Sequence, residues 1–153
     1  MKVILWSVFT NISYQGVSIA ATNVDFVLLG FENWGPVYMK DNLANSSSQF
    51  IFLSFTICMA VATIFGALTA GYIGDKAGGY KDRRALFATL LVFITLMVGA
   101  SVAYFSNHRD GFIVGYFIMI FTENLVEPIF LGIMLTLVKP HEREVANSMN
   151  LFV

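Results

Sequence analysis

Three long runs of apolar residues alternate with short polar stretches along most of the chain. Residues 49–74, 85–105 and 112–138 each carry few or no charged side chains. About 20 consecutive apolar residues are enough to cross the ~30 Å hydrocarbon core of a bilayer. The pattern therefore predicts three transmembrane helices over these ranges.

A fourth predicted span, over residues 13–38, is less uniformly apolar. It contains Asn23, Asp25 and Glu32, yet it has the length of a membrane-crossing helix. The chain before it opens with Lys2 and a short apolar run, which polar residues soon interrupt. Two interpretations of this opening are open, a cleaved signal peptide and a short interfacial helix, and the interruptions favour the helix.

Composition supports a membrane protein. Of the 153 residues 57% are hydrophobic and 12% are charged, and the mean hydropathy is +0.71. Soluble domains average about 25% charged residues. Helices of these lengths buried in a soluble domain would leave almost no side chains to face water.

Several function classes find no support in the composition. The net charge of −1 gives no indication of the basic surface that nucleic-acid binding requires. The single cysteine, Cys58, falls inside a predicted span, where a disulfide or a metal site is not expected. The sequence shows no phosphate-binding glycine loop and no nucleophile–base pattern. We therefore expect no enzyme activity, no cofactor and no metal.

Basic residues predict the orientation in the membrane. With four spans, seven Lys and Arg residues lie on the side of the N-terminus and only two, Lys40 and Arg109, lie on the other. The seven are Lys2, Lys76, Lys81, Arg83, Arg84, Lys139 and Arg143. The positive-inside rule then makes the N-terminus and the 75–84 loop cytoplasmic, in the plasma membrane or an endomembrane. The opposite loop contains the glycosylation sequon Asn45-Ser46-Ser47, and whether it is modified stays open.

The stretch "GYIGDKAGGYKDRR", residues 71–84, concentrates charge between the second and third spans. Its basic residues fit an anchor at the lipid headgroups. Asp75 does not, because a carboxylate near a helix C-terminus opposes the negative end of the helix dipole. Asp75 therefore requires a partner, such as an Arg or the N-terminus of another helix. Gly71, one turn earlier, would let a neighbouring helix approach closely.

This stretch resembles motif A of the major facilitator superfamily, G-x-x-x-D-[RK]-x-G-[RK]-[RK], which joins the second and third helices of a six-helix half. The matching residues are Gly71, Asp75, Lys76 and Gly78; the basic pair, Arg83 and Arg84, comes later than in the family pattern. The resemblance implies a cytoplasmic latch between helices, with Asp75 as acceptor and Lys76, Arg83 or Arg84 as donors.

Two flanking stretches resemble spinster-like transporters of that superfamily. "GFENWGPVYM" is similar to the end of their seventh helix, and "EPIFLGIMLTLVKPHEREVANSMN" to their tenth helix and the loop that follows. The resemblance implies that residues 1–153 are a fragment of one transporter domain, with an incomplete fifth span from about residue 144. The alternative is a self-contained four-span protein.

Polar residues within the spans are the candidate site. Asn11, Ser18, Asp25 and Glu32 recur every seven residues and form one stripe along a helix, with Thr22 beside them. In the fourth span Glu123 and Glu127 share one face, next to Asn124 and Pro128. Glu32 can reach water at the outer end of its span.

A carboxylate at bilayer depth is costly, so Asp25, Glu123 and Glu127 should face a cavity or a neighbouring helix. Glu123 or Glu127 is a candidate for proton coupling. In the superfamily, the first and fourth helices of each half line the central cavity, and the polar stripes fall on those two spans. The second span instead carries small residues, Gly66, Ala67, Ala70, Gly71 and Gly74, which favour close helix packing.

These patterns predict an all-α polytopic transmembrane bundle that forms part of a major-facilitator half. The expected function is secondary transport of a small organic or lipid-like solute by alternating access, in contact with membrane lipids and with the remainder of the transporter. The alternative from another class is a small four-span scaffold or accessory subunit without transport activity.

Overall fold

The computed structural model describes residues 6–8, 10–43, 47–76 and 83–150. Its helices are α2 (Ile12–Asn42), α3 (Ser48–Lys76), α4 (Arg83–Phe105), α5 (Arg109–Leu137), the short 3₁₀ helix η1 (Pro140–Glu142) and α6 (Arg143–Asn150). The described ranges contain no strand, which confirms the all-α prediction. Five residues named above lie outside the described residues: Lys2, Asn45, Ser46, Gly78 and Lys81.

Three of these helices are long and apolar enough to cross a membrane: residues 48–73 of α3, 87–105 of α4 and all of α5. The three apolar runs are therefore confirmed as helices of membrane-spanning length. α2 has 31 residues but is not among these three, because Asn23, Asp25 and Glu32 lower its hydropathy. A total of four spans stays a prediction.

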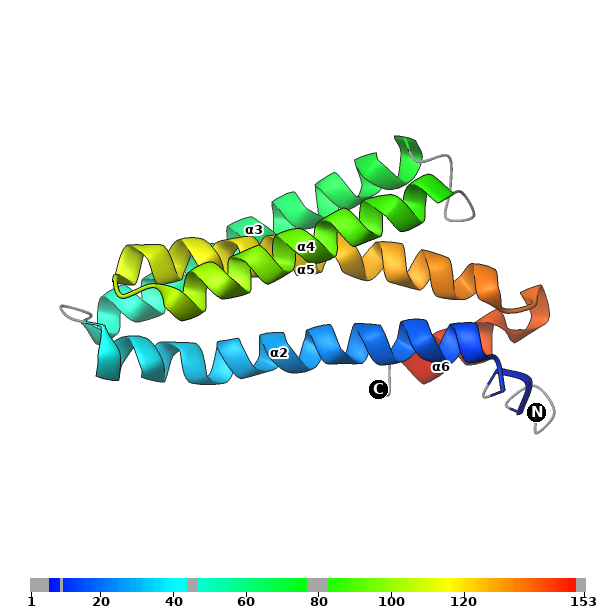
Figure 1. The fold of residues 1–153 in the computed structure, drawn as a ribbon, viewed down its shortest axis with the longest axis horizontal. Coiled ribbons are helices and arrows are strands. Elements are labelled where there is room, and N and C mark those ends of the chain that lie inside the picture. Colours follow the sequence, from blue (N-terminus) through cyan, green and yellow to red (C-terminus); the bar gives the residue numbers. More distant parts are fainter. Residues whose placement is uncertain (1–5, 9, 44–46, 77–82, 151–153) are drawn as a thin grey trace.

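α5 is the central helix of the bundle (Figure 1). It packs along α3 and α4 over much of their length, and α2 runs antiparallel to it with fewer contacts. The start of α2, the end of α3, the start of α4 and the end of α5 lie at the same end of the molecule (Figure 1). This is the up-and-down order that the predicted topology requires, and it brings the Lys- and Arg-rich segments to one end.

Glycines bring α4 and α5 into close contact. A Cβ at Gly115 would collide with the backbone nitrogen of Ala103 and would lie 2.7 Å from the carbonyl oxygen of Gly99. A Cβ at Gly99 would lie 2.8 Å from Cγ2 of Ile118. Gly99 and Ala103 are four residues apart on α4, the small-x-x-x-small spacing that lets membrane helices approach. This contact holds α4 against the first half of α5.

The predicted small-residue face of α3 is present only in part. Gly66 and Ala70 are buried, and a Cβ at Gly66 would lie 2.7 Å from the carbonyl oxygen of Phe121 on α5. Ala67 and Gly71 are exposed, and a Cβ at Gly71 would meet nothing within 4 Å. Close packing on α5 therefore uses Gly66 and Ala70, one turn apart on a single face.

The outer faces of α3 and α4 are apolar and exposed. Phe65 and Leu68 of α3, and Phe87 and Met97 of α4, have more than half of their surface accessible. Contiguous exposed apolar surface is rare on soluble monomers, and lipid tails are its natural neighbour in a spanning helix. The arrangement fits a protein embedded in a membrane.

A polar network ties the N-terminal segment to the end of α5. The Asn11 side chain caps α2 by accepting from the Tyr14 backbone N–H, and its Nδ2 donates to the carbonyl of Leu137 at 2.8 Å. The Tyr14 hydroxyl donates to the carbonyl of Ala146 at 2.8 Å. Three segments that are distant in sequence, the start of α2, the end of α5 and α6, are thereby joined.

Glu142 in this region carries a carboxyl group that is largely buried, since the residue is only 5% exposed. The Ser7 hydroxyl donates to its carboxylate, and the Lys139 backbone N–H donates to its Oε2 at 3.1 Å. Although burial opposes the charged form, these hydrogen bonds and the nearby charges of Lys139 and His141 lower the pKa of Glu142 below its ordinary value. Glu142 is therefore held ionised at neutral pH.

Gly115→Ala should destabilise the bundle, because the added methyl group needs the space that the α4 backbone occupies. Over-packing of this kind costs about 1–3 kcal/mol. The thermal unfolding midpoint of the purified chain in detergent, followed by circular dichroism, should fall.

Gly16→Ala is the matched control, because Gly16 lies inside α2 and a Cβ there meets nothing within 4 Å. Replacing an unrestrained helix glycine by alanine gains about 0.5–1 kcal/mol. Equal midpoints for the two variants would show that α4 and α5 are not in close contact at Gly115.

Candidate functional site

The structure brings the acidic residues of α2 and α5 together. The Glu123 carboxyl group experiences electrostatic repulsion from three other acidic residues, which are, from strongest to weakest, Glu32, Asp25 and Glu127. Glu32 and Asp25 come from α2, and Glu127 lies one turn further along α5. We call these four residues the acidic cluster.

The acidic cluster lies at the depth of the bilayer centre if α5 spans the membrane. Glu123 is the central residue of α5, equally far from Arg109 and Leu137. It is half-buried, as is Glu32, whereas Asp25 and Glu127 are exposed. None of the four forms a hydrogen bond or an ion pair with another described residue. Each carboxyl group therefore retains its full capacity for a ligand, water or a proton.

Asn124 lies on a different side of α5 from the acidic cluster. Its Cβ is so close to α3 that a methyl group at Gly66 would lie 2.8 Å from it. Its Nδ2 donates to the carbonyl of Ile120 on its own helix at 2.8 Å. Asn124, predicted as a cavity residue, packs at the α3–α5 contact.

A hollow of about 440 Å³ lies between α2, α3 and α5, and Glu32 of the acidic cluster is one of its lining residues. We call it the polar hollow. Its polar side chains are Glu32, Lys40, Ser48, Thr56 and Tyr116. Its apolar lining comes from Pro36, Val37, Ile51, Phe52, Phe55 and Met59. Ligand sites commonly combine a mainly apolar wall with a few polar groups in a volume of this order.

Tyr116 has an unusual environment in this hollow. Its side chain is 1% exposed, and its hydroxyl has no hydrogen-bond partner among the described residues. The titratable groups with the strongest electrostatic influence on its hydroxyl are, in order, Glu32, Cys58 and Glu123. The ring itself packs on Phe55, with centroids 4.4 Å apart. Its hydroxyl is thus buried by packing, is influenced by the charges of Glu32 and Glu123, and is hydrogen-bonded to neither.

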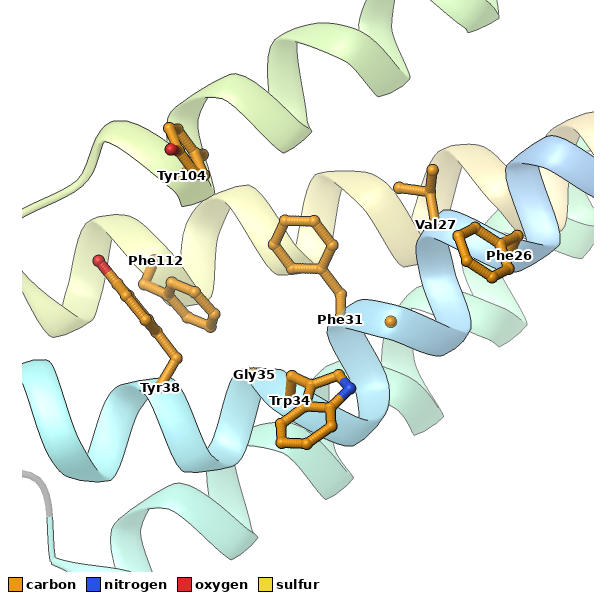
Figure 2. Close-up of a pocket in the computed structure, with 9 residues that line it drawn as sticks. Phe26, Val27, Phe31, Trp34, Gly35, Tyr38, Tyr104 and Phe112 are labelled. Atoms are coloured by element: carbon orange, nitrogen blue, oxygen red, sulfur yellow. The ribbon is translucent and has the colours of Figure 1, made fainter.

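A second hollow of about 380 Å³ lies on the other side of α2 and is almost wholly apolar (Figure 2). Tyr38 of α2 stacks on Phe112 of α5 with centroids 5.6 Å apart, and the Phe31 ring also approaches Phe112. Tyr104 of α4 lies across from them (Figure 2). This aromatic hollow lacks carboxyl groups among its lining residues and offers mainly apolar contact.

The motif-A-like residues occupy the end of the bundle where α3 stops and α4 starts. Asp75 lies in the last turn of α3, and Arg83 is the first residue of α4. The Lys76 ammonium lies over the ring of Tyr72, 4.8 Å from its centroid, and Arg84 is exposed. A Cβ at Gly71 would meet nothing within 4 Å, and the side chains of Asp75 and Arg83 lie outside the described part of the chain, so the latch stays a prediction.

Sequence reasoning did not identify Tyr116, Lys40 or the polar hollow. One signal was present for Tyr116: it precedes Glu123 by seven residues, which places both on one face of a helix. A tyrosine in an apolar run is otherwise indistinguishable from a side chain that only packs against its neighbours. Only the antiparallel packing of α2 on α5 shows that Glu32 lies near it.

Comparisons with protein-family models, curated proteins and solved structures found no match for this chain.

Tyr116→Phe should leave the stability of the chain unchanged or raise it, because it removes a buried hydroxyl without a partner. An unsatisfied buried polar group costs about 1–3 kcal/mol. Tyr14→Phe is the matched comparison, since the Tyr14 hydroxyl is also buried but donates to Ala146 at 2.8 Å.

Loss of that bond should lower stability by about 0.5–1.5 kcal/mol. Thermal unfolding of both variants in the same detergent measures the difference. If Tyr116→Phe were as destabilising as Tyr14→Phe, the Tyr116 hydroxyl would have a partner after all.

Proposed function

We propose that the chain is part of a membrane-embedded secondary transporter that moves a small organic or lipid-like solute by alternating access, with the proton as candidate coupling ion. The observation that carries the proposal is the acidic cluster. It places four carboxyl groups around the centre of α5, and none of them is paired with a described residue.

A purely structural role explains this cluster poorly. A charged side chain at the bilayer centre costs roughly 2.5–3.5 kcal/mol on insertion scales, and like charges close together add to that cost. A scaffold needs no such groups. A transporter does, because its solute and coupling ion must find partners at mid-membrane depth. Asp25 and Glu127 are exposed on this chain, so their faces must border water or further protein.

The sequence resemblance supports the same class. A motif-A-like stretch, Gly71, Asp75, Lys76, Gly78, Arg83 and Arg84, follows the first of the three apolar spans. In the proposed mechanism it latches helices on the cytoplasmic side and releases as the transporter changes conformation. The spinster-like stretches suggest an amphiphilic solute, and the Lys- and Arg-rich end of the bundle would face the cytoplasm.

Glu123→Gln should abolish the dependence of uptake on a proton gradient, because the amide can neither bind nor release the proton. The measurement is uptake of fluorescent lysophosphatidylcholine and of a panel of small metabolites into proteoliposomes, with and without an imposed proton gradient. Glu127→Gln is tested in parallel, since the two carboxyl groups are one turn apart.

Asp110→Asn is the control, because Asp110 is an exposed carboxylate on the same helix and is paired with Arg109 at 3.4 Å. A gradient effect that survives in both glutamine variants would remove the two residues as coupling groups. No accumulation of any solute by the unmodified chain would count against transport and favour a scaffold.

Asp75→Asn should slow uptake about tenfold, a loss of ~1.4 kcal/mol in the free energy of the rate-limiting step, while expression is retained. The reason is that the proposed latch needs a carboxylate that bonds to a cation or a helix N-terminus. Asp41→Asn, an exposed residue at the opposite end of the bundle, serves as its control. Normal uptake by Asp75→Asn would exclude the latch.

A further inference from the structure

The polar hollow has distinct inner and outer ends. Lys40 and Ser48 lie near the end of α2 and the start of α3, whereas Glu32, Met59 and Tyr116 lie deeper. Glu32 and Lys40 are eight residues apart on α2, which separates them by about 12 Å along the helix axis. They form no ion pair with each other. The inner end of the hollow is therefore acidic and is not neutralised by Lys40.

The inner end fits an organic cation better than a metal ion. No group of three or more His, Cys, Asp or Glu side chains among the described residues is arranged to hold a metal. Glu32 lines the hollow, and Glu123 lies close enough to act on the same hydroxyl of Tyr116. An anionic ligand would be repelled by both carboxylates. A neutral ligand would leave the negative charges of the two carboxylates uncompensated.

The buried hydroxyl of Tyr116 also points to a ligand in the polar hollow. Tyr116 and Glu32 both line the hollow, the Tyr116 hydroxyl is buried without a partner, and the charges of Glu32 and Glu123 act on it. A buried hydroxyl oxygen can accept a hydrogen bond as well as donate one. A ligand N–H group between Tyr116 and Glu32 would satisfy the hydroxyl and the carboxylate together. A protonated amine supplies such N–H groups with the positive charge that the site requires.

The side chains that line the hollow indicate which chemical group is attached to the amine. Phe52 and Phe55 present aromatic rings, and Met59 and Val37 add aliphatic surface. Aromatic faces attract cations, and apolar side chains favour an apolar substituent. The hollow's volume of about 440 Å³ suits a small amphiphilic amine.

We propose that the polar hollow binds a protonated amine that carries an apolar or aromatic group. The ammonium lies between the Glu32 carboxylate and the Tyr116 hydroxyl, and the apolar group packs on Phe52, Phe55 and Met59. This deepens the proposed transport function and rests on it, because it names the solute class of the same acidic site.

Equilibrium binding to the purified full chain in detergent tests the inference with three probes of similar shape. 2-Phenylethylammonium is the cation, 2-phenylethanol its neutral analogue and 3-phenylpropanoate its anionic analogue. We expect the cation to bind at least ~10-fold more tightly than the alcohol, equivalent to ~1.4 kcal/mol, and the anion to bind most weakly. Equal affinity for all three would overturn the inference, since the hollow would then recognise only the phenyl group.

Variants assign the binding to the named residues. Glu32→Gln should weaken binding of 2-phenylethylammonium about tenfold or more, and Tyr116→Phe, which keeps the ring and its packing, about three- to tenfold. Asp110→Asn makes the same change of charge on an exposed residue outside the hollow and should leave affinity unchanged. Circular dichroism confirms that each variant is folded. Undiminished binding by folded Glu32→Gln would refute the site.

Two results separate this inference from the proposed function. If the amine binds with this pattern but no solute accumulates in proteoliposomes, transport is wrong and the binding site stands. If proteoliposomes accumulate lysophosphatidylcholine while 2-phenylethylammonium shows no preference over 2-phenylethanol, the amine site is wrong and transport stands.

Discussion

Hydrocarbon offers a carboxylate neither a hydrogen bond nor a counter-charge, and this constraint accounts for the arrangement of the helices around α5. Glu123 lies at the centre of α5, so the face that bears it must point toward protein or water. α3 and α4 cover other faces of α5 with small and apolar residues and turn their own apolar surfaces outward. α2, which also carries two acidic residues near mid-length, lies beside the remaining face.

Most of the fold follows from the sequence, because a helix that crosses a membrane has to be apolar over its whole length. The structure extends the predicted spans by a few residues: α4 begins at Arg83 instead of 85, and α5 at Arg109 instead of 112. Helices continue through polar residues into the headgroup region, where hydropathy no longer marks their ends. The contact of Gly99 and Ala103 with Gly115 was not predicted, since within a uniformly apolar run the sequence does not show which side meets a neighbour.

The candidate site was predictable in its charges but not in its surroundings. Asp25, Glu32, Glu123 and Glu127 stand out because charged residues are rare in apolar runs, and the structure brings them together. Asn124 was assigned to the same cavity because it is next to Glu123 in sequence. Neighbouring residues on a helix point about 100° apart, however, and Asn124 therefore faces Gly66 of α3. Tyr116 shares a helical face with Glu123, but only the antiparallel packing of α2 on α5 shows that Glu32 lies near enough to influence it.

The contacts of α2 differ along its length in a way that bears on movement. At its start, Asn11 and Tyr14 are hydrogen-bonded to Leu137 and Ala146, and near its end Tyr38 stacks on Phe112. Between these directional contacts, Val24 and Leu28 contribute only apolar burial, which has no preferred geometry. Pro36 lacks a backbone N–H and thereby weakens the helix between the acidic residues and the stacked ring. A ligand or proton that changed the charge between α2 and α5 would therefore act where α2 has only apolar contacts, away from the close α3–α4–α5 contacts at Gly66, Gly99 and Gly115.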